Sequence, residues 1–278
     1  MRLGGPLAAE YDGPESWIKD LKDSGYGAAY APLHPDADDA TVAAYAGAAK
    51  KADIVIAEVG GWSNPMDPNP ILAKEALAHS QACLELAERL GARCCVNIAG
   101  SLRADKWDGP HPDSFSSDTF ARVVDVTRAI IDAVKPRRTF YALEPMPWML
   151  PSSVDEYLRL IEAIDRPAMG AHLDPVNLIN SPAIAYDTSA FIKDAFQRLG
   201  PYIKSCHAKD IRLSDELTVH LSESRPGLGT LDYRTFIKEV EKLGADSTMM
   251  LEHLPKEEYA PAAAHIRGVA AEIGVAIR

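Results

Sequence analysis

Four side chains of metal-binding type lie far apart in the sequence, each at the end of an apolar run. They are Glu144 in YALEP, Asp174 in AHLDPVN, His207 in SCHAKD and Glu252 in MLEHL. Three carboxylates and one imidazole form an oxygen-rich ligand set, for which Mn2+ is the preferred ion and Mg2+, Co2+, Fe2+ and Zn2+ are alternatives. The sequence therefore predicts one divalent metal ion held by these four residues.

The elements that must bring these residues together are short β-rich runs that alternate with longer segments of helical periodicity. Predicted strands cover residues 1–4, 28–32, 54–59, 93–98, 139–144, 169–174, 203–208 and 248–252. Predicted helices include residues 15–23, 70–90, 118–134, 154–164 and 233–243. Several helical segments are followed by a glycine, as expected at a helix C-terminus: Gly25, Gly91, Gly200 and Gly244. The alternation predicts an α/β fold with parallel strands.

Eight strands favour a closed (β/α)8 TIM barrel over an open doubly wound sheet. No phosphate-binding GxGxxG segment follows the first predicted strand, which argues against a dinucleotide-binding sheet. No linker or shift in composition divides the chain, so we expect one barrel domain over residues 1–278. Neighbouring strands lie about 4.8 Å apart and end at one mouth, where four consecutive strand ends can reach a single ion.

Other polar side chains fall at the same strand ends or in the loops that follow. Lys209 and His172 each lie two residues from a metal-ligand candidate, on the same strand face. We interpret Lys209 as a group that polarises a substrate oxygen or hydrogen-bonds a ligand carboxylate; the alternative is an ion pair with Asp210 or another rim carboxylate. His172 is interpreted as a partner of a metal ligand rather than a fifth ligand. His253, on the other strand face, is expected to be structural.

Tryptophans in the predicted mouth loops suggest a carbohydrate ligand, because indole faces pack well on the C–H faces of sugar rings. The alternative for each tryptophan is that it fixes a loop to the barrel. The candidate substrate-binding residues are Lys209, His172, Asn177, Glu58, Trp62, Trp107, Trp148, Arg212 and His220.

The segments LEP, HLDPVN, HAKD, RPGLGTLDY and LEHL, in this order and spacing, resemble the sugar phosphate isomerase/epimerase superfamily of xylose-isomerase-like TIM barrels. This superfamily includes ketose 3-epimerases and inosose dehydratases, and the resemblance covers nearly the whole chain. It implies that Glu144, Asp174, His207 and Glu252 bind the metal, and that Glu144 and Glu252 are also the catalytic proton carriers. The implied function is a divalent-metal-dependent sugar isomerase or epimerase that abstracts a proton next to a carbonyl through a metal-stabilised enediolate.

The chain departs from the ketose 3-epimerases at two positions, which leaves the substrate open. Those enzymes have a histidine where this chain has Asn177 and a substrate-binding glutamate where it has Leu150. The apolar run PMPWML after Glu144 suggests a substrate with a larger or less polar part than a free ketose, such as a keto-glycoside or a cyclitol.

Two other classes of function remain as alternatives. A metal-dependent lyase or dehydratase would use the same enolate to expel a group from a keto-sugar, keto-glycoside or inosose. A non-catalytic barrel would bind a ligand or another subunit. A phosphoesterase like the DNA-repair barrels would need a cluster of zinc-binding histidines, whereas the eight histidines here are scattered.

Composition limits the partners further. The net charge of −11 is spread along the chain without a basic patch, so we expect a small carbohydrate-like substrate and no nucleic acid. No apolar stretch reaches the roughly 18 residues of a membrane helix, and residues 1–12 lack a signal-peptide pattern, so we expect no membrane contact and a cytoplasmic location. The resemblance also allows a homo-oligomer.

Overall fold

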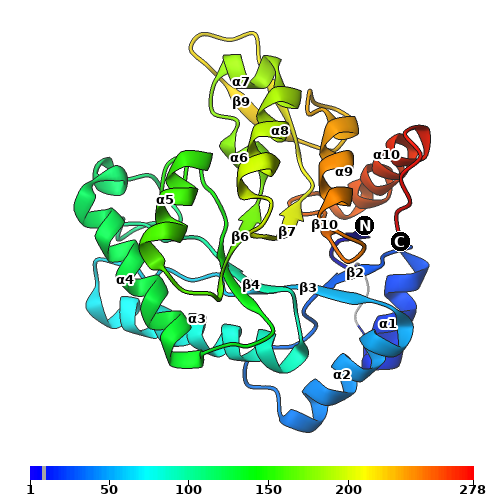
Figure 1. Ribbon diagram of the computed structural model, residues 1–278, viewed down its shortest axis with the longest axis horizontal. Helices are drawn as coiled ribbons and strands as arrows, with labels where there is room; N and C mark the ends of the chain where they lie inside the picture. The colour runs from blue at the N-terminus through cyan, green and yellow to red at the C-terminus, as the bar shows by residue number, and fades with distance from the viewer. Residues whose placement is uncertain (8–10) are drawn as a thin grey trace.

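Eight of the apolar runs pair as parallel strands and close into a barrel, in the order β1, β10, β7, β6, β5, β4, β3, β2. The computed structural model describes residues 1–7 and 11–278 (Figure 1). The barrel strands are β1 (Arg2–Gly4), β2 (Ala28–Tyr30), β3 (Val55–Gly60), β4 (Cys94–Asn97), β5 (Phe140–Leu143), β6 (Met169–Leu173), β7 (Ile203–His207) and β10 (Thr248–Met250). The predicted (β/α)8 barrel is confirmed: six strands match their predicted ranges within one residue at each end, and β2 and β10 end two residues earlier than predicted.

Helices surround the barrel on its outside (Figure 1). The longer ones are α1 (Pro14–Asp23), α2 (Asp39–Ala52), α3 (Pro70–Leu90), α4 (Ser117–Val134), α5 (Val154–Ile164), α8 (Thr188–Leu199), α9 (Tyr233–Lys242) and α10 (Tyr259–Glu272). Short turns of helix are α6 (Pro175–Leu178), α7 (Pro182–Tyr186) and the 3-10 segments η1 (Pro112–Phe115) and η2 (Lys256–Glu258). None of the helices in the described residues is long and apolar enough to cross a membrane.

Three of the four glycines predicted to end helices have the left-handed backbone that favours glycine. Gly25, Gly91 and Gly244 have φ values of 68°, 69° and 119°. Gly200 differs: its φ of −45° is right-handed, so it closes α8 without a left-handed turn. The prediction that Gly200 ends a helix is confirmed, because α8 ends at Leu199 and Gly200 is its C-cap.

Helix α5 shows how an outer helix supports the mouth of the barrel. Its buried residues Val154, Tyr157, Leu160 and Ile164 recur every three to four positions, which places them on one face. The Tyr157 hydroxyl donates to the backbone oxygen of Leu143 and accepts from the His172 backbone N–H at 3.1 Å. One buried phenol thus joins the ends of β5 and β6, next to the candidate ligands.

An antiparallel hairpin, β8 (Asp210–Leu213) and β9 (Leu221–Ser224), is inserted between β7 and α9. The sequence does not signal these strands. The Asp210 carboxylate anchors the following loop, because it accepts hydrogen bonds from the backbone N–H groups of Gly227, Gly229 and Leu231 at 2.9 to 3.0 Å. A Cβ at residue 229 would lie 2.3 Å from Asp210 Oδ1, so this loop requires glycine there.

Candidate active site

Glu144, Asp174, His207 and Glu252 meet at the carboxyl ends of their strands, where each offers one ligand atom and all four atoms lie within 4.8 Å of one another. The Nδ1 atom of His207 is 2.8 Å from Glu252 Oε1, 3.0 Å from Glu144 Oε1 and 3.9 Å from Asp174 Oδ2. Asp174 and His207 are fully buried, and Glu144 is nearly so. Four segments distant in sequence therefore form one acidic cluster.

Local hydrogen bonds fix the direction of these carboxylates. Asp174 is the N-cap of α6, and its Oδ1 accepts from the backbone N–H of Val176 at 2.9 Å. The Oδ2 atom of Asp174 is thereby turned toward the cluster. Glu144 extends the β4–β5 pairing through its own N–H, which donates to the Asn97 backbone oxygen at 2.8 Å. The Asn177 amide donates to Glu144 Oε1 at 3.2 Å.

Lys209 lies inside the cluster with only 2% of its side chain exposed. Its Nζ is 2.5 Å from Glu252 Oε1 and 2.8 Å from Asp174 Oδ2. Burial by itself would lower the pKa of Lys209, but the neighbouring carboxylates outweigh it and hold this pKa above its usual value. Lys209 thus pairs with two carboxylates of the cluster, whereas Asp210 is occupied with the glycine loop.

The charges of the cluster depend on one another. Burial by itself would lower the pKa of His207, but Glu252 and the other acidic groups around it raise that pKa well above the usual value. Burial also favours the neutral form of Glu252, yet His207 and Lys209 outweigh it and lower the pKa of this carboxyl. Ionised carboxylates are therefore balanced by cationic side chains in this buried site.

The residues fit a divalent cation. Ligand atoms about 2.1 Å from one ion lie about 3 to 4.2 Å from each other. The distances of 2.8 to 3.9 Å from His207 Nδ1 to the three carboxylates are close to this range. Asp174 Oδ2 and Glu252 Oε1 are buried yet accept no hydrogen bond of good geometry from the described residues. Such oxygen atoms require positive charge, which Lys209 supplies in part and a cation could complete.

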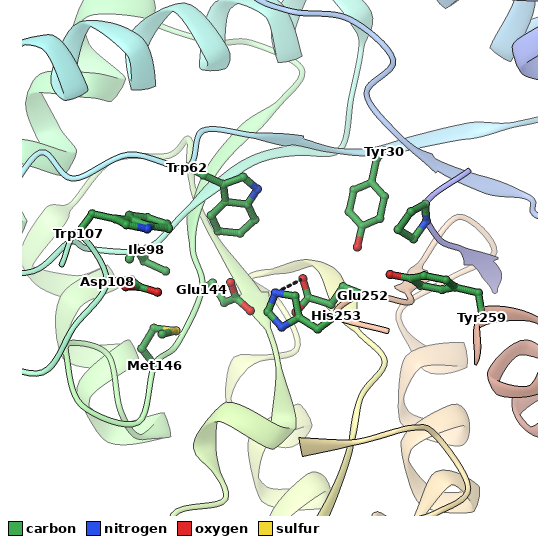
Figure 2. A pocket seen from close by; sticks show the side chains of 11 residues that line it. Tyr30, Trp62, Ile98, Trp107, Asp108, Glu144, Met146, Glu252, His253 and Tyr259 are labelled. Atoms are coloured by element: carbon green, nitrogen blue, oxygen red, sulfur yellow. Dashed lines mark ion pairs between the residues drawn. The ribbon is translucent and has the colours of Figure 1, made fainter. Parts of the chain in front are cut away.

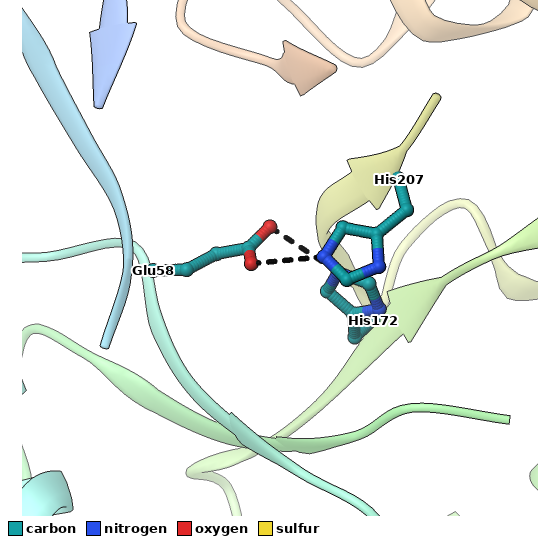
Figure 3. Close-up of side chains that lie close together, drawn as sticks. All are labelled: Glu58, His172 and His207. Carbon is teal, nitrogen blue, oxygen red and sulfur yellow. Dashed lines mark hydrogen bonds and ion pairs between the residues drawn. The ribbon is translucent and has the colours of Figure 1, made fainter. Parts of the chain in front are cut away.

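A second layer lies below the cluster, formed by Glu58 on β3 and His172 on β6 (Figure 3). Glu58 Oε2 is 3.2 Å from His207 Nε2, and Glu58 Oε1 is 3.2 Å from His172 Nε2. The Ser205 hydroxyl also donates to Glu58 Oε1. Glu58, His172 and His207 are fully buried and could together hold a cation as well. Glu58 and His172 therefore lie beneath the pocket and not at substrate-binding positions. The His172 ring packs against the His207 ring with centroids 4.0 Å apart, which agrees with its interpretation as a partner of a metal ligand.

Two cavities open beside the acidic cluster. The first, about 680 Å³, is lined mainly by aromatic and apolar side chains, including Tyr30, Trp62, Trp107 and Tyr259 (Figure 2). The second, about 690 Å³, is lined in part by Asn177, Asn180, Lys209 and Glu223. Both are also lined by Asp108, Glu144, Met146 and His253.

The remaining substrate-binding candidates differ in position. Trp62 and Trp107 line the first cavity, and Trp148 and Asn177 line the second. The ring N–H of Trp148 donates to the Asp108 backbone oxygen at 2.7 Å, so this tryptophan also fixes one mouth loop to another. Arg212 and His220 are exposed on the hairpin segment and line neither cavity. The expectation that both reach the substrate does not agree with this geometry.

His253 is a site residue that sequence reasoning assigned a structural role. Simple strand alternation would turn it away from the mouth, but its positive φ of 54° breaks the alternation. The imidazole lines both cavities, and its Nδ1 lies 3.4 Å from Glu223 Oε2. Tyr30, Asp108, Glu223 and Tyr259 are further lining residues that carry no motif. The only feature of the sequence that could have indicated these four residues is their position near strand ends or in mouth loops.

Comparisons with solved structures show the same fold in proteins of several activities, at identities too low to carry function. A 3-keto-D-glucoside 4-epimerase from E. coli is 15% identical with a TM-score of 0.68, covering 96% of this chain and 99% of that one. A probable 3-DHS dehydratase from Bacillus anthracis is 16% identical with a TM-score of 0.71, covering 96% and 98%. Endonuclease IV from Thermus thermophilus is 15% identical with a TM-score of 0.72, covering 98% and 100%.

The sequence itself identifies the family. No curated protein matches this chain in a sequence search. A family model described as a xylose isomerase-like TIM barrel matches residues 18–269, most of the chain. Together with the closed eight-stranded barrel, this match shows that the chain belongs to the xylose isomerase-like TIM barrel family.

Proposed function

We propose that this protein is a divalent-metal-dependent isomerase or epimerase of a carbohydrate-like keto compound, with Mn2+ as the preferred ion. Glu144, Asp174, His207 and Glu252 are its metal ligands in this proposal. The observation that carries it is the convergence of these four side chains, three of them carboxylates, at the carboxyl-terminal mouth of the barrel. That mouth is where barrels of this type carry their active sites.

The reaction would begin with loss of a proton from the carbon next to a carbonyl. A bound divalent cation supplies stabilisation of the negative charge that develops on the carbonyl oxygen, an effect of several kcal/mol. Glu144 and Glu252 each direct Oε1 toward His207, and both also line the first cavity. One carboxylate removes the proton and the other returns it from the opposite face, which inverts the carbon.

Lys209 assists by placing a positive charge between two carboxylates of the cluster. Its ammonium group lies between Asp174 and Glu252 and also lines the second cavity. From this position its positive charge attracts both carboxylates, and it can donate a hydrogen bond to a substrate oxygen. Burial of the surrounding groups excludes water, which strengthens these electrostatic contacts.

A lyase is the second candidate, and His253 favours it. The imidazole lines both cavities, with Nε2 3.7 Å from Glu252 Oε2. A group that can carry a proton thus stands beside a carboxylate that can remove one. An acid near the base can protonate a leaving hydroxyl or glycosyl group, so that the enolate eliminates instead of taking back a proton.

Solvent exchange tests the proposal. The purified protein, with its metal identified and Mn2+ added, is incubated in heavy water with ketoses, keto-glycosides and inososes. An epimerase incorporates deuterium into recovered substrate and epimer, whereas a lyase yields an unsaturated or cleaved product. Glu144→Gln and Glu252→Gln are expected to abolish exchange, and Glu257→Gln, at an exposed position, is the matched control. Absence of exchange with every compound, despite bound metal, would contradict the proposal.

A further inference from the structure

The space around the acidic cluster is larger than a free sugar needs. Cavities of about 680 Å³ and about 690 Å³ share the lining residues Asp108, Glu144, Met146 and His253. Pockets of roughly 300 to 1,000 Å³ hold whole drug-sized molecules. A six-carbon ketose over the carboxylates would occupy only part of this space. The site therefore has room for a substrate with a second portion.

The two cavities differ in chemistry. At one end of the first cavity, Trp62 and Trp107 lie near Ile98 and Met146, and Glu144 lies between this group and Glu252 (Figure 2). We call the side chains of Trp62, Trp107, Ile98 and Met146 the tryptophan lobe. The second cavity has a mixed lining, in which amides and charges that suit hydroxyl groups, among them Asn177, Asn180, Lys209 and Glu223, lie beside apolar side chains such as Trp148, Val176 and Leu221. The first cavity thus offers mainly apolar surface, with the Asp108 carboxylate beside Trp107, and the second offers more of the hydrogen-bonding groups that a polyol needs.

The two indoles of the tryptophan lobe are partly exposed beside the acidic cluster. Trp62 is 41% exposed and Trp107 43% exposed, although most large apolar side chains of this chain are buried. No hydrogen bond joins the ring N–H of either indole to a residue that the structure describes. Trp148, by contrast, uses its N–H to fix a loop. Exposed aromatic surface beside a reactive cluster gains free energy when a ligand covers it.

Gly60 at the end of β3 makes room for the Trp62 ring. A Cβ built at this position would lie 2.5 Å from Trp62 Nε1 and 2.8 Å from Cδ1. Any larger residue at position 60 would push the indole from its place. The position of this exposed ring therefore depends on the backbone of a barrel strand, not on a loop alone.

We propose that the substrate is a keto-glycoside with an aromatic aglycone. The sugar ring lies over Glu144 and Glu252 with its hydroxyl groups toward the second cavity, and the aglycone lies in the tryptophan lobe. The sugar chemistry in this assignment rests on the proposed function, whereas the assignment of the lobe rests on the cavities and the exposed indoles. The opposite arrangement, with the sugar ring stacked on the indoles, is an outcome of the test.

Calorimetry on the Mn2+-loaded protein tests the assignment with matched ligands. The probes are the methyl and phenyl D-glucopyranosides in both anomeric forms, together with their 3-keto derivatives. The phenyl compounds are expected to bind at least about tenfold more tightly than the methyl compounds, because the phenyl ring buries apolar surface in the lobe. Trp62→Ala, Trp107→Ala and Gly60→Ala should each reduce this preference, with methyl affinity kept within about twofold. Tyr186→Ala, at an 80% exposed position outside both cavities, is the control and should leave the preference unchanged.

Three results would overturn the assignment. One is equal affinity for the methyl and phenyl compounds. Another is an equal loss for both in the tryptophan variants, which would place the sugar ring on the indoles. The third is a lack of binding by every phenyl glycoside. Solvent exchange is measured separately. A phenyl preference without exchange would contradict the proposed function and support the assignment of the tryptophan lobe. Exchange without a phenyl preference would support the proposed function and contradict the assignment of the lobe.

Discussion

The two ring nitrogens of His207 face different carboxylates, and the deeper contact joins His207 to Glu58. Nε2 of His207 lies 3.2 Å from Glu58 Oε2, while Nδ1 lies 3.0 Å from Glu144 Oε1. A hydrogen bond from Nε2–H to Glu58 leaves the Nδ1 lone pair available to a cation. In the proposed metal site, Glu58 would therefore be a positioning residue that sets the tautomer and orientation of the imidazole.

Glu58→Gln is expected to weaken Mn2+ binding by about 10- to 100-fold, because the neutral amide holds the imidazole less firmly. Titration calorimetry on the variant measures this affinity directly. Glu85→Gln, at an exposed position on α3, is the control and should bind Mn2+ as the unaltered protein does. An unchanged affinity in a folded Glu58→Gln protein would show that the contact does not support the metal site.

Lys209→Met tests the charge balance of the cluster. Removing the ammonium leaves Asp174 and Glu252 as buried carboxylates without their closest cation. The metal-free variant is expected to lose about 3 kcal/mol of unfolding free energy. Added Mn2+ should restore more stability to the variant than it adds to the unaltered protein, since the ion replaces the missing charge. Urea unfolding with and without Mn2+ measures both effects, and an equal response to Mn2+ would contradict the prediction.

Tyr157→Phe tests the buried phenol that joins β5 and β6. The change leaves the backbone oxygen of Leu143 and the backbone N–H of His172 without their hydroxyl partner. We expect a loss of about 1 to 3 kcal/mol in unfolding free energy, the usual cost of unpaired buried polar groups. Denaturant unfolding measures it. Tyr186→Phe, at an exposed position, should change stability by less than about 0.5 kcal/mol.

Asp232 gives a prediction about pH. It caps α9, accepting from the Thr235 N–H at 3.1 Å and the Thr235 hydroxyl at 2.7 Å. Burial by itself would raise the pKa of Asp232, but these hydrogen bonds outweigh it and lower the pKa. Because the folded-state pKa is the lower one, the stabilisation is present above the unfolded pKa of about 3.9 and is lost as pH falls through the folded pKa.

Asp232→Ala should therefore cost about 1 kcal/mol of unfolding free energy at pH 7 and progressively less below about pH 4. Urea unfolding at a series of pH values follows the difference between the two proteins. Asp125→Ala, at an exposed position within α4, should show no such trend. A cost that stays constant down to pH 3 would mean that the charge of Asp232 does not contribute to capping.

The barrel could be predicted from sequence because short apolar runs alternate with helical segments eight times, and most of these runs, though not β1 and β2, end in or near a polar residue. The same pattern located Glu144, Asp174, His207 and Glu252, since a polar side chain directly after a buried strand must face the mouth. How deep a side chain lies inside the barrel is harder to predict from its position along a strand. Glu58 lies two residues before the end of β3, which puts it inside the barrel rather than at the rim.

Backbone conformation explains most of what could not be predicted. The positive φ of His253 reverses the side that alternation assigns to it, and no neighbouring residue signals this turn. The β8–β9 hairpin has no recognisable two-residue turn, so its pairing was not apparent. Arg212 and His220 were expected near the substrate only because their segment follows a site strand. In the hairpin they are exposed, whereas Val219, Leu221 and Glu223 line the second cavity.

The β8–β9 hairpin is a place where the sequence of this protein can change without changing the barrel. Its two strands hydrogen-bond to each other and to none of the barrel strands, yet they carry part of one wall of the second cavity. New sequences grafted between Leu213 and Leu221 would reshape that wall without altering any strand that holds an acidic ligand. Under the proposed function, this wall and the strands of the acidic cluster are separable pieces of the chain, so that the wall can be redesigned while the cluster is kept.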